Sequence, residues 1–404
     1  MNVHGSHDPR FAQVLDEFNR NFLEGQEVGA SVCVTVDGET VVDLHGGVAN
    51  PATGAPWKQD TVGLVWSATK GATALCAHIL VSRGQLDLDA PVAQYWPEFA
   101  AARKDQVTVR MALAHQAAVP AVRTPLPPGA FANWDLVTAA IAAEEPFWEP
   151  GTRHGYHAFT FGWLIGELVQ RVSGKPFASF FRDEVAGPLE LDFHIGLDAA
   201  HEPRVAPTIP AAPPAPEEMA GMWVAAFTDP SSIPAMVLAN SGGYLEPGAA
   251  DSREMHSAII PAAGGVTNAR GLAHMYRPLA LGGTYQGVRL VEPWAIRAMT
   301  SVVSATSVDA TLLVPTRWSA GFNKGVDNRG RAREKDSILL SESAFGHPGM
   351  GGSIGFADPG ARMSFGYTMN RQGTSLGIDE RAQSLIDAVY RALGYCEAPG
   401  GWML

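Results

Sequence analysis

The hydrophobic pattern along the chain predicts an amphipathic helix near each end. Between residues 9 and 25 apolar side chains recur at helical spacing, namely Phe11, Val14, Leu15, Phe18 and Phe22. Residues 379–393 repeat this pattern with Ala382, Leu385, Ile386, Val389 and Leu393 on one face. An amphipathic helix must cover an apolar surface elsewhere in the fold. We therefore expect both helices to pack on one sheet.

Strand signals lie beside both helices. Residues 30–36 and 39–44 are rich in Val and Thr, and Asp37-Gly38 between them is typical of a tight hairpin. Three later segments have strand character: 318–322, 352–357 and 361–369. The last two are joined across Asp358-Pro359-Gly360, which is a turn sequence. The pattern predicts an antiparallel sheet built from both ends of the chain.

The middle of the chain carries helical patterns and no strand pattern. The predicted helices of this section cover residues 67–83, 108–115, 134–144 and 159–172. A later helix, after this section, begins near Thr267 and Asn268. Six prolines in residues 203–216 argue against a helix or an interior strand there, so we expect a surface loop. A linker between two independent domains is the alternative interpretation.

These elements predict an α+β fold, in which N- and C-terminal helices flank an antiparallel sheet and a mostly helical region is inserted. We assign residues 1–66 and 260–404 to the sheet domain. Residues 67–259, with the proline-rich loop 203–216, form the helical domain.

The composition of the chain limits the kinds of molecule that the protein is expected to bind. The 404 residues are 46% hydrophobic and 17% charged, and the formal net charge is -12 without a run of Lys or Arg. This argues against nucleic acid or an anionic membrane as a partner. The sequence shows no disulfide framework, no signal pattern and no apolar run long enough to span a bilayer. We expect a cytoplasmic protein that acts on a small molecule; the oligomeric state stays open.

The first candidate for chemistry is the pair Ser67 and Lys70, at the start of an apolar helix. Their spacing places both side chains on one helix face. A serine hydroxyl becomes a good nucleophile when a neighbour takes its proton. A lysine amine does this once burial lowers its pKa.

Two further stretches supply groups that such a serine needs. Tyr156 follows a turn sequence and precedes a helical pattern, where a phenol is fixed in orientation; beside Lys70 it would experience that positive charge and act as a proton shuttle. Residues 346–352 are a glycine-rich run on or beside a strand, where the backbone can approach a ligand closely.

Taken together, these stretches resemble the serine β-lactamase and penicillin-binding-protein superfamily, in particular its class C-like branch with the family VIII carboxylesterases. Ser67-Ala68-Thr69-Lys70 matches the Ser-x-x-Lys motif, and Pro150-Gly151-Thr152 with Tyr156 is similar to the segment that bears the catalytic tyrosine. His347-Pro348-Gly349 is similar to the Lys-Thr-Gly strand, in a His-x-Gly form.

This resemblance implies an acyl-enzyme at Ser67, with Lys70 and Tyr156 handling its proton. It implies an oxyanion hole made by the backbone N–H groups of Ser67 and Met350. His347, Gly349 and Gly351 would contact the substrate, and no cofactor or metal is implied.

Departures from the family pattern favour esters over β-lactams. Tyr156-His157-Ala158 replaces the usual Tyr-x-Asn, and His347 and Pro348 replace the lysine and threonine of the third motif. The expected function is hydrolysis of short-chain carboxylic esters. Acyl transfer, or hydrolysis of amides or β-lactams, on the same scaffold is the alternative. A non-catalytic binding protein is the alternative from another class.

A competing signal is Gly351-Gly352-Ser353-Ile354-Gly355, which matches the Gly-x-Ser-x-Gly elbow of α/β-hydrolases, with His45-Gly46-Gly47 as its oxyanion loop. That fold needs a histidine after its nucleophile, and none follows Ser353. The residues after Ser353 also have strand character instead of the required helix.

His154 and His157 stand three apart, but no Cys or Glu cluster accompanies them. We therefore expect no metal site.

Overall fold

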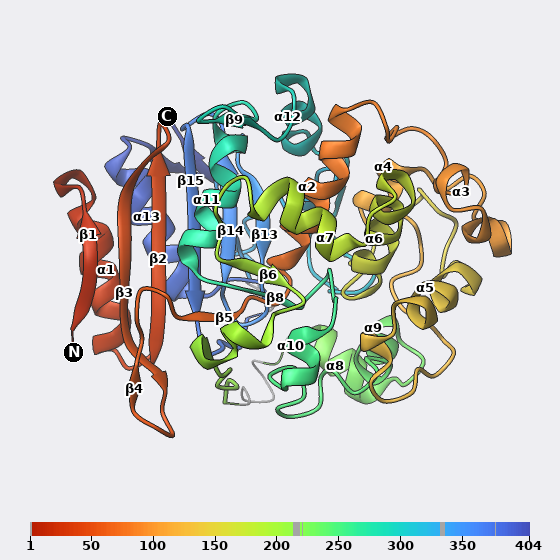
Figure 1. The fold of residues 1–404 in the computed structure, drawn as a ribbon, viewed down its shortest axis with the longest axis horizontal. Coiled ribbons are helices and arrows are strands. Elements are labelled where there is room, and N and C mark those ends of the chain that lie inside the picture. The colour runs from red at the N-terminus through yellow and green to blue at the C-terminus, as the bar shows by residue number, and fades with distance from the viewer. Residues whose placement is uncertain (1, 213–218, 220, 332–335, 376) are drawn as a thin grey trace.

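A seven-stranded antiparallel sheet forms one side of the protein in the computed structural model (Figure 1). The structure describes residues 2–212, 219, 221–331, 336–375 and 377–404. The strand order is β1 (Val3–His7), β3 (Glu39–Asn50), β2 (Gly29–Val36), β15 (Met363–Met369), β14 (Ile354–Asp358) and β13 (Phe345–Pro348), with β4 (Ala55–Pro56) paired to β3. The prediction that both ends of the chain build the sheet is confirmed.

The centre of the sheet joins remote parts of the sequence. β2 and β3 form the predicted hairpin, in which Asp37 and Gly38 have the positive φ values of 53° and 88° that its tight turn requires. The other edge of β2 pairs with β15, with Ala30 opposite Met369.

Helices cover both faces of this sheet. α1 (Ala12–Leu23) and α13 (Glu380–Ala392) contact each other, and their apolar faces share one core with the inner sides of the central strands. α11 (Ala269–Ala280) covers the opposite face, against β2, β14 and β15. α11 lies so close that a Cβ at Gly366 would come within 2.1 Å of the carbonyl oxygen of Ala269. The expected packing of the two terminal helices is confirmed.

The rest of the chain is mostly helical and lies beside the sheet (Figure 1). Its α-helices are α2 (Thr69–Ser82), α3 (Val92–Tyr95), α4 (Val109–Leu113), α5 (Trp134–Ala143), α6 (Thr160–Ser173), α7 (Phe177–Phe181), α8 (Gly221–Thr228), α9 (Ile233–Ala239), α10 (Arg253–Ser257) and α12 (Pro293–Thr300). α2 is buried from Thr69 to Val81. Such complete enclosure explains why most of its residues are apolar, and why its buried polar side chains, such as Lys70 and His78, are hydrogen-bonded within the protein.

No strand interrupts residues 67–174, as expected, but two short strands that the sequence did not indicate follow this section. β6 (Phe193–Ile195) and β7 (Val205–Ala206) join β8 (Gly265–Thr267) and β5 (Val62–Leu64) in a four-stranded sheet. Strands of two or three residues are too short to show an alternating pattern.

The proline-rich segment is more regular than expected. Pro203 lies inside a 3-10 helix, Ala199–Arg204, and the edge strand β7 follows directly. Residues 207–212 belong to no helix or named strand, which agrees with the predicted loop, whereas residues 213–216 lie outside the described residues.

The strand predicted at 318–322 is displaced. β12 (Thr316–Trp318) pairs with β11 (Ser304–Thr306) and ends where the prediction begins. Residues 319–322 form a turn in which Ser319 N–H donates to the Phe322 carbonyl at 2.9 Å and Gly321 has φ 96°. The remaining short strands are β9 (Thr284–Tyr285), β10 (Val288–Arg289), β16 (Cys396–Ala398) and β17 (Gly401–Met403). The two-domain division stays a prediction.

Within the described part of the chain, every helix is too short or too polar to cross a bilayer.

Truncation of the core between α1 and the sheet should destabilise the protein strongly. Phe18 is fully buried, with its ring edge-on to Phe22 at 5.2 Å between centroids. Phe18→Ala is expected to lower the free energy of unfolding by about 3–5 kcal/mol, because it removes apolar contacts and leaves a cavity. Urea titration followed by circular dichroism measures this loss. Leu23→Ala on the same helix is the control, since Leu23 is 84% exposed and should change stability by less than about 0.5 kcal/mol.

Candidate active site

Ser67 and Lys70 stand together at the start of α2. Lys70 Nζ lies 3.0 Å from Ser67 Oγ, within hydrogen-bond distance. Trp66, directly before the serine, has φ 48°, a backbone conformation that costs energy for a bulky residue. Ser67 is half-buried and lines a cavity, so a substrate can reach its hydroxyl.

The surroundings of Lys70 favour the neutral amine. The side chain is fully buried, and burial holds its pKa well below the ordinary 10.5. Among the described residues no acidic group shifts that pKa upward. Nζ also donates to the carbonyl oxygens of Ala158 at 2.7 Å and Ala262 at 2.9 Å. A neutral amine has two N–H groups, which these carbonyls satisfy, so its lone pair faces Ser67 Oγ.

Tyr156 completes a cluster of three polar groups. Its hydroxyl is hydrogen-bonded to the Ser67 hydroxyl, and Lys70 Nζ lies 4.8 Å from the centre of its ring. Burial raises the pKa of Tyr156 and outweighs that hydrogen bond, which lowers it. The sequence predicts a charged lysine beside this phenol. The structure instead surrounds Tyr156 with groups that keep it protonated, so it is available as a proton donor.

Sequence reasoning missed the residues that hold Tyr156. Its N–H donates to Asp309 Oδ1 at 2.9 Å, and the next N–H, of His157, donates to His115 Nδ1 at 3.1 Å. Trp318 stacks on the tyrosine ring with 5.4 Å between centroids and 7° between planes. Asp309 lies 153 residues from Tyr156, so no local pattern announces the contact.

The glycine-rich run continues from β13 into a turn, residues 349–353, that touches the residues before Ser67. A Cβ at Gly349 would come within 2.2 Å of the Val65 carbonyl oxygen, so glycine is required here. Within the described chain, the N–H groups of Ser67 and Met350 donate no hydrogen bond. The Met350 side chain lines the same cavity as Ser67.

Ser353, the serine of the competing motif, is buried at the end of this turn. Its hydroxyl donates to the Val65 carbonyl at 3.1 Å, and it is 1% exposed. The strand β14 follows it, whereas a nucleophile elbow would need a helix. The geometry therefore gives Ser353 a structural contact beside Ser67.

His347 is a neutral side chain in this environment. Nδ1 lies 2.7 Å from the Pro348 carbonyl oxygen and must donate to it, which leaves a lone pair on Nε2. Burial, and then the proximity of Lys70, lower the pKa of His347 to about 3. A neutral imidazole that presents the lone pair of Nε2 has neither the positive charge nor the N–H donor with which a lysine ammonium holds a carboxylate. A role of His347, Gly349 and Gly351 in substrate contact stays a prediction.

The histidines at 154 and 157 are engaged within the protein. His154 bonds to Thr316 and Ser304 through its two ring nitrogens, and His157 accepts from Val119 N–H and donates to the Gly155 carbonyl. The described residues hold no cluster of three or more metal-ligating side chains.

The cavity in front of Ser67 has a volume of about 130 Å³ and is mostly apolar. Side chains from α8, α9 and the turns around them form one wall: Met222, Trp223, Val237, Leu238 and Leu245. Phe159, Trp318 and Met350 line it near the serine, together with His347. Such a cavity accepts an uncharged group with an apolar chain.

Comparisons with known proteins agree with this geometry. The family model described as beta-lactamase matches residues 11–388. The chain is 35% identical over 391 residues to the protein named Esterase/beta-lactamase LipL of Mycobacterium tuberculosis, across 94% of this chain and 86% of that protein.

Two solved structures share the whole fold. One is described as a family VIII carboxylesterase, with 37% identity, a TM-score of 0.85, and coverage of 97% of this chain and 100% of that chain. The other, a penicillin-binding protein homolog from Caulobacter crescentus, has 35% identity, a TM-score of 0.83 and the same coverage. The resemblance and the α+β architecture expected from the sequence are confirmed, and this chain belongs to the beta-lactamase family.

Proposed function

We propose that this protein is a serine carboxylesterase that cleaves short-chain carboxylic esters through an acyl-enzyme on Ser67. The observation that carries the proposal is the position of Lys70, whose two carbonyl acceptors direct its lone pair at Ser67 Oγ. The esterase names of similar proteins support the same class of reaction.

In the proposed acylation, Lys70 takes the proton of Ser67 as Oγ attacks the ester carbonyl. The N–H groups of Ser67 and Met350 receive the developing oxyanion. Tyr156, kept protonated by burial, donates its proton to the departing alkoxide and recovers one from Lys70. In deacylation the same groups activate a water molecule, and the acid is released from Ser67.

The surroundings of the site favour a neutral substrate. His347 is neutral and Ala158 carries only a methyl group, so the positions that would hold the carboxylate and amide of a β-lactam lack a cation and an amide side chain. The apolar cavity suits an uncharged acyl or alcohol group.

The first prediction concerns the nucleophile. Ser67→Ala should reduce ester hydrolysis to background, because it removes the group that forms the acyl-enzyme. Ser353→Ala loses one hydrogen bond to Val65 and should keep more than about a tenth of the activity. Purified variants are compared on p-nitrophenyl acetate. Peptide mass spectrometry after a fluorophosphonate should show the label on Ser67, and a label on Ser353 would contradict the proposal.

The second prediction concerns pH. The base must be neutral Lys70, so kcat/KM should fall as the pH falls through the Lys70 pKa and reach a plateau above it. Burial places that midpoint well below 10.5. Lys70→Arg should be inactive across the range, since guanidinium stays protonated. The check is a pH profile of kcat/KM on a neutral ester. A midpoint at or above 10.5 would show that Lys70 is not the base.

The third prediction concerns substrate class. Compared with a site that keeps the usual lysine and asparagine, this site lacks two hydrogen bonds to charged groups, which contribute roughly 1.5–3 kcal/mol each. β-Lactam turnover should therefore be slower than at such a site by about 10² to 10³, even if the losses only partly add. Short p-nitrophenyl esters should react readily, with rates falling as the acyl chain lengthens from acetyl to dodecanoyl. The measurement is kcat/KM for these esters, nitrocefin and a penicillin on one preparation. Nitrocefin turnover as fast as the best ester would refute the ester assignment and leave Ser67 as nucleophile.

A further inference from the structure

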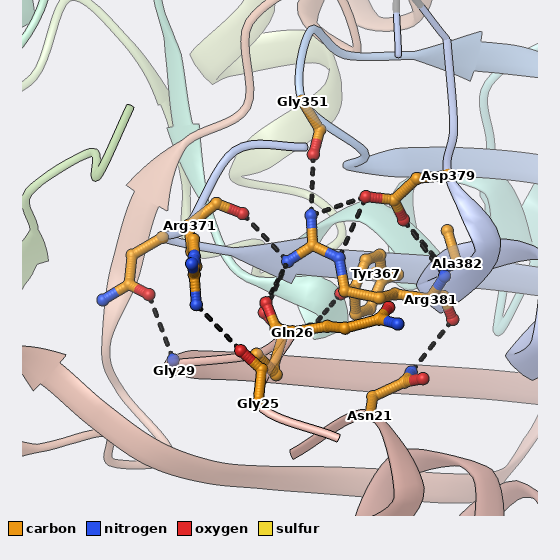
Figure 2. Close-up of polar contacts among 12 residues, drawn as sticks. Asn21, Gly25, Gln26, Gly29, Gly351, Tyr367, Arg371, Asp379, Arg381 and Ala382 are labelled. Atoms are coloured by element: carbon orange, nitrogen blue, oxygen red, sulfur yellow. Dashed lines mark hydrogen bonds and ion pairs between the residues drawn. The ribbon is translucent and has the colours of Figure 1, made fainter. Parts of the chain in front are cut away.

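Arg381 lies at the centre of a buried polar cluster next to the 349–353 turn. It stands in the first turn of α13, two residues after the N-cap Asp379, and its side chain is 3% exposed. Figure 2 shows its guanidinium between Gly351, Asp379, Arg371 and Gln26, which belong to four separate parts of the chain. Arg381 is not among the residues that line the cavity in front of Ser67, so it is placed to act on the site through other groups.

The partners of this guanidinium occupy all three of its nitrogens. Nε and Nη2 donate to Asp379 Oδ2 at 2.9 Å and 2.7 Å, and Nη1 donates to Glu27 Oε1 at 3.0 Å. Nη1 also reaches the carbonyl oxygens of Gln26 and Arg371, at 3.2 Å and 2.9 Å. The last hydrogen bond connects the cluster to the 349–353 turn: Nη2 donates to the Gly351 carbonyl at 3.1 Å.

The 349–353 turn needs such an anchor. Gly351 and Gly352 have φ values of 88° and 124°, and glycine has so many accessible conformations that these values are not fixed by the residues themselves. The Gly351 carbonyl is held by Arg381 and by the N–H of Gly373, at 2.8 Å. The Met350 N–H lies in the peptide unit whose carbonyl belongs to Gly349, and that carbonyl accepts from the Gly352 N–H at 3.1 Å. Anchoring the Gly351 carbonyl fixes the Gly351–Gly352 peptide unit, and through this hydrogen bond it also helps to orient the Met350 N–H.

We propose that Arg381 is a positioning residue, whose bond to the Gly351 carbonyl holds the Met350 N–H in the place where the oxyanion forms. This inference rests on the proposed function. Asp379 supplies a negative charge to the buried guanidinium. Burial raises the pKa of Glu27 to about 7 in spite of Arg381, so Glu27 serves chiefly as a hydrogen-bond acceptor, and Tyr367 donates to its second oxygen. A lysine cannot replace Arg381, because an ammonium lacks the flat fork that reaches Asp379 and Gly351 together.

The test is Arg381→Lys in the full chain. Steady-state kinetics on p-nitrophenyl butyrate are combined with the inhibition constant of a phenylboronic acid, which forms a tetrahedral adduct on the nucleophile and mimics the oxyanion state. We expect kcat to fall about 10- to 100-fold, since a misplaced donor costs less than a deleted one. The boronic acid should bind weaker by a similar factor, while KM changes less than about threefold.

Arg371→Lys is the matched control. The Arg371 side chain donates to the Gly25 carbonyl in the same neighbourhood, whereas its own backbone carbonyl is the group that Arg381 binds. It should retain wild-type kinetics and boronic acid affinity.

If Arg381→Lys does not fold, Glu27→Gln serves as the second variant. It loosens the guanidinium on the side away from Gly351 and should reduce kcat and boronic acid affinity together, by about three- to tenfold.

A folded Arg381→Lys with unchanged kcat and unchanged boronic acid affinity would overturn the inference, and so would equal losses in Arg371→Lys. Failure of the proposed function has a different signature. In that case the boronic acid and a fluorophosphonate would not react with Ser67 of the unmodified protein, whatever residue stands at 381.

Discussion

The close approach of two backbone segments is the constraint on which the site depends. The turn after β13 passes so near the residues before α2 that a single methyl group at Gly349 would overlap the Val65 carbonyl. Ser353 adds a hydrogen bond to that same carbonyl. Because of this contact, the segment with Met350 and the segment with Ser67 border one cavity, although they lie on different elements.

The second organising factor is that, among the described residues, no negative charge offsets the burial of Lys70. Histidines at 115, 157 and 347 surround the site, and burial lowers the pKa of each, so all three are neutral imidazoles near neutral pH. Asp309 is directed at the N–H of Tyr156 and at neighbouring backbone N–H groups. A lysine in such surroundings loses its proton easily, which suits a base. The same surroundings offer little attraction to an anionic ligand.

The elements with long, regular patterns were predictable from the sequence. Five apolar positions on each terminal helix, and the Asp37-Gly38 turn, identify their structures without tertiary information. The spacing of Ser67 and Lys70 likewise needs only the geometry of one helix turn. β6 and β7 were missed, because two or three residues carry no period and their pairing partners decide their conformation.

The supporting residues of the site could not be predicted for a different reason. Asp309 and Arg381 act on backbone groups of Tyr156 and Gly351, which they meet only through the tertiary fold. Aspartate in a loop and arginine in the first turn of a helix are ordinary at those places. Their role appears once the partner atom is known, and a single sequence does not contain that information.

The pairing of β2 with β15 decides when the central sheet can form during synthesis of the chain. Ala30 faces Met369 across the middle of the sheet, so a chain leaving the ribosome exposes one edge of the β2–β3 hairpin until strand β15 has been synthesised. An unpaired apolar edge invites association with other chains, and contacts this distant in sequence form slowly. The protein therefore passes through a long stage of synthesis in which Ser67, Lys70 and Tyr156 already exist but the central sheet does not, and during that stage the free edge of β2 is open to association with other chains.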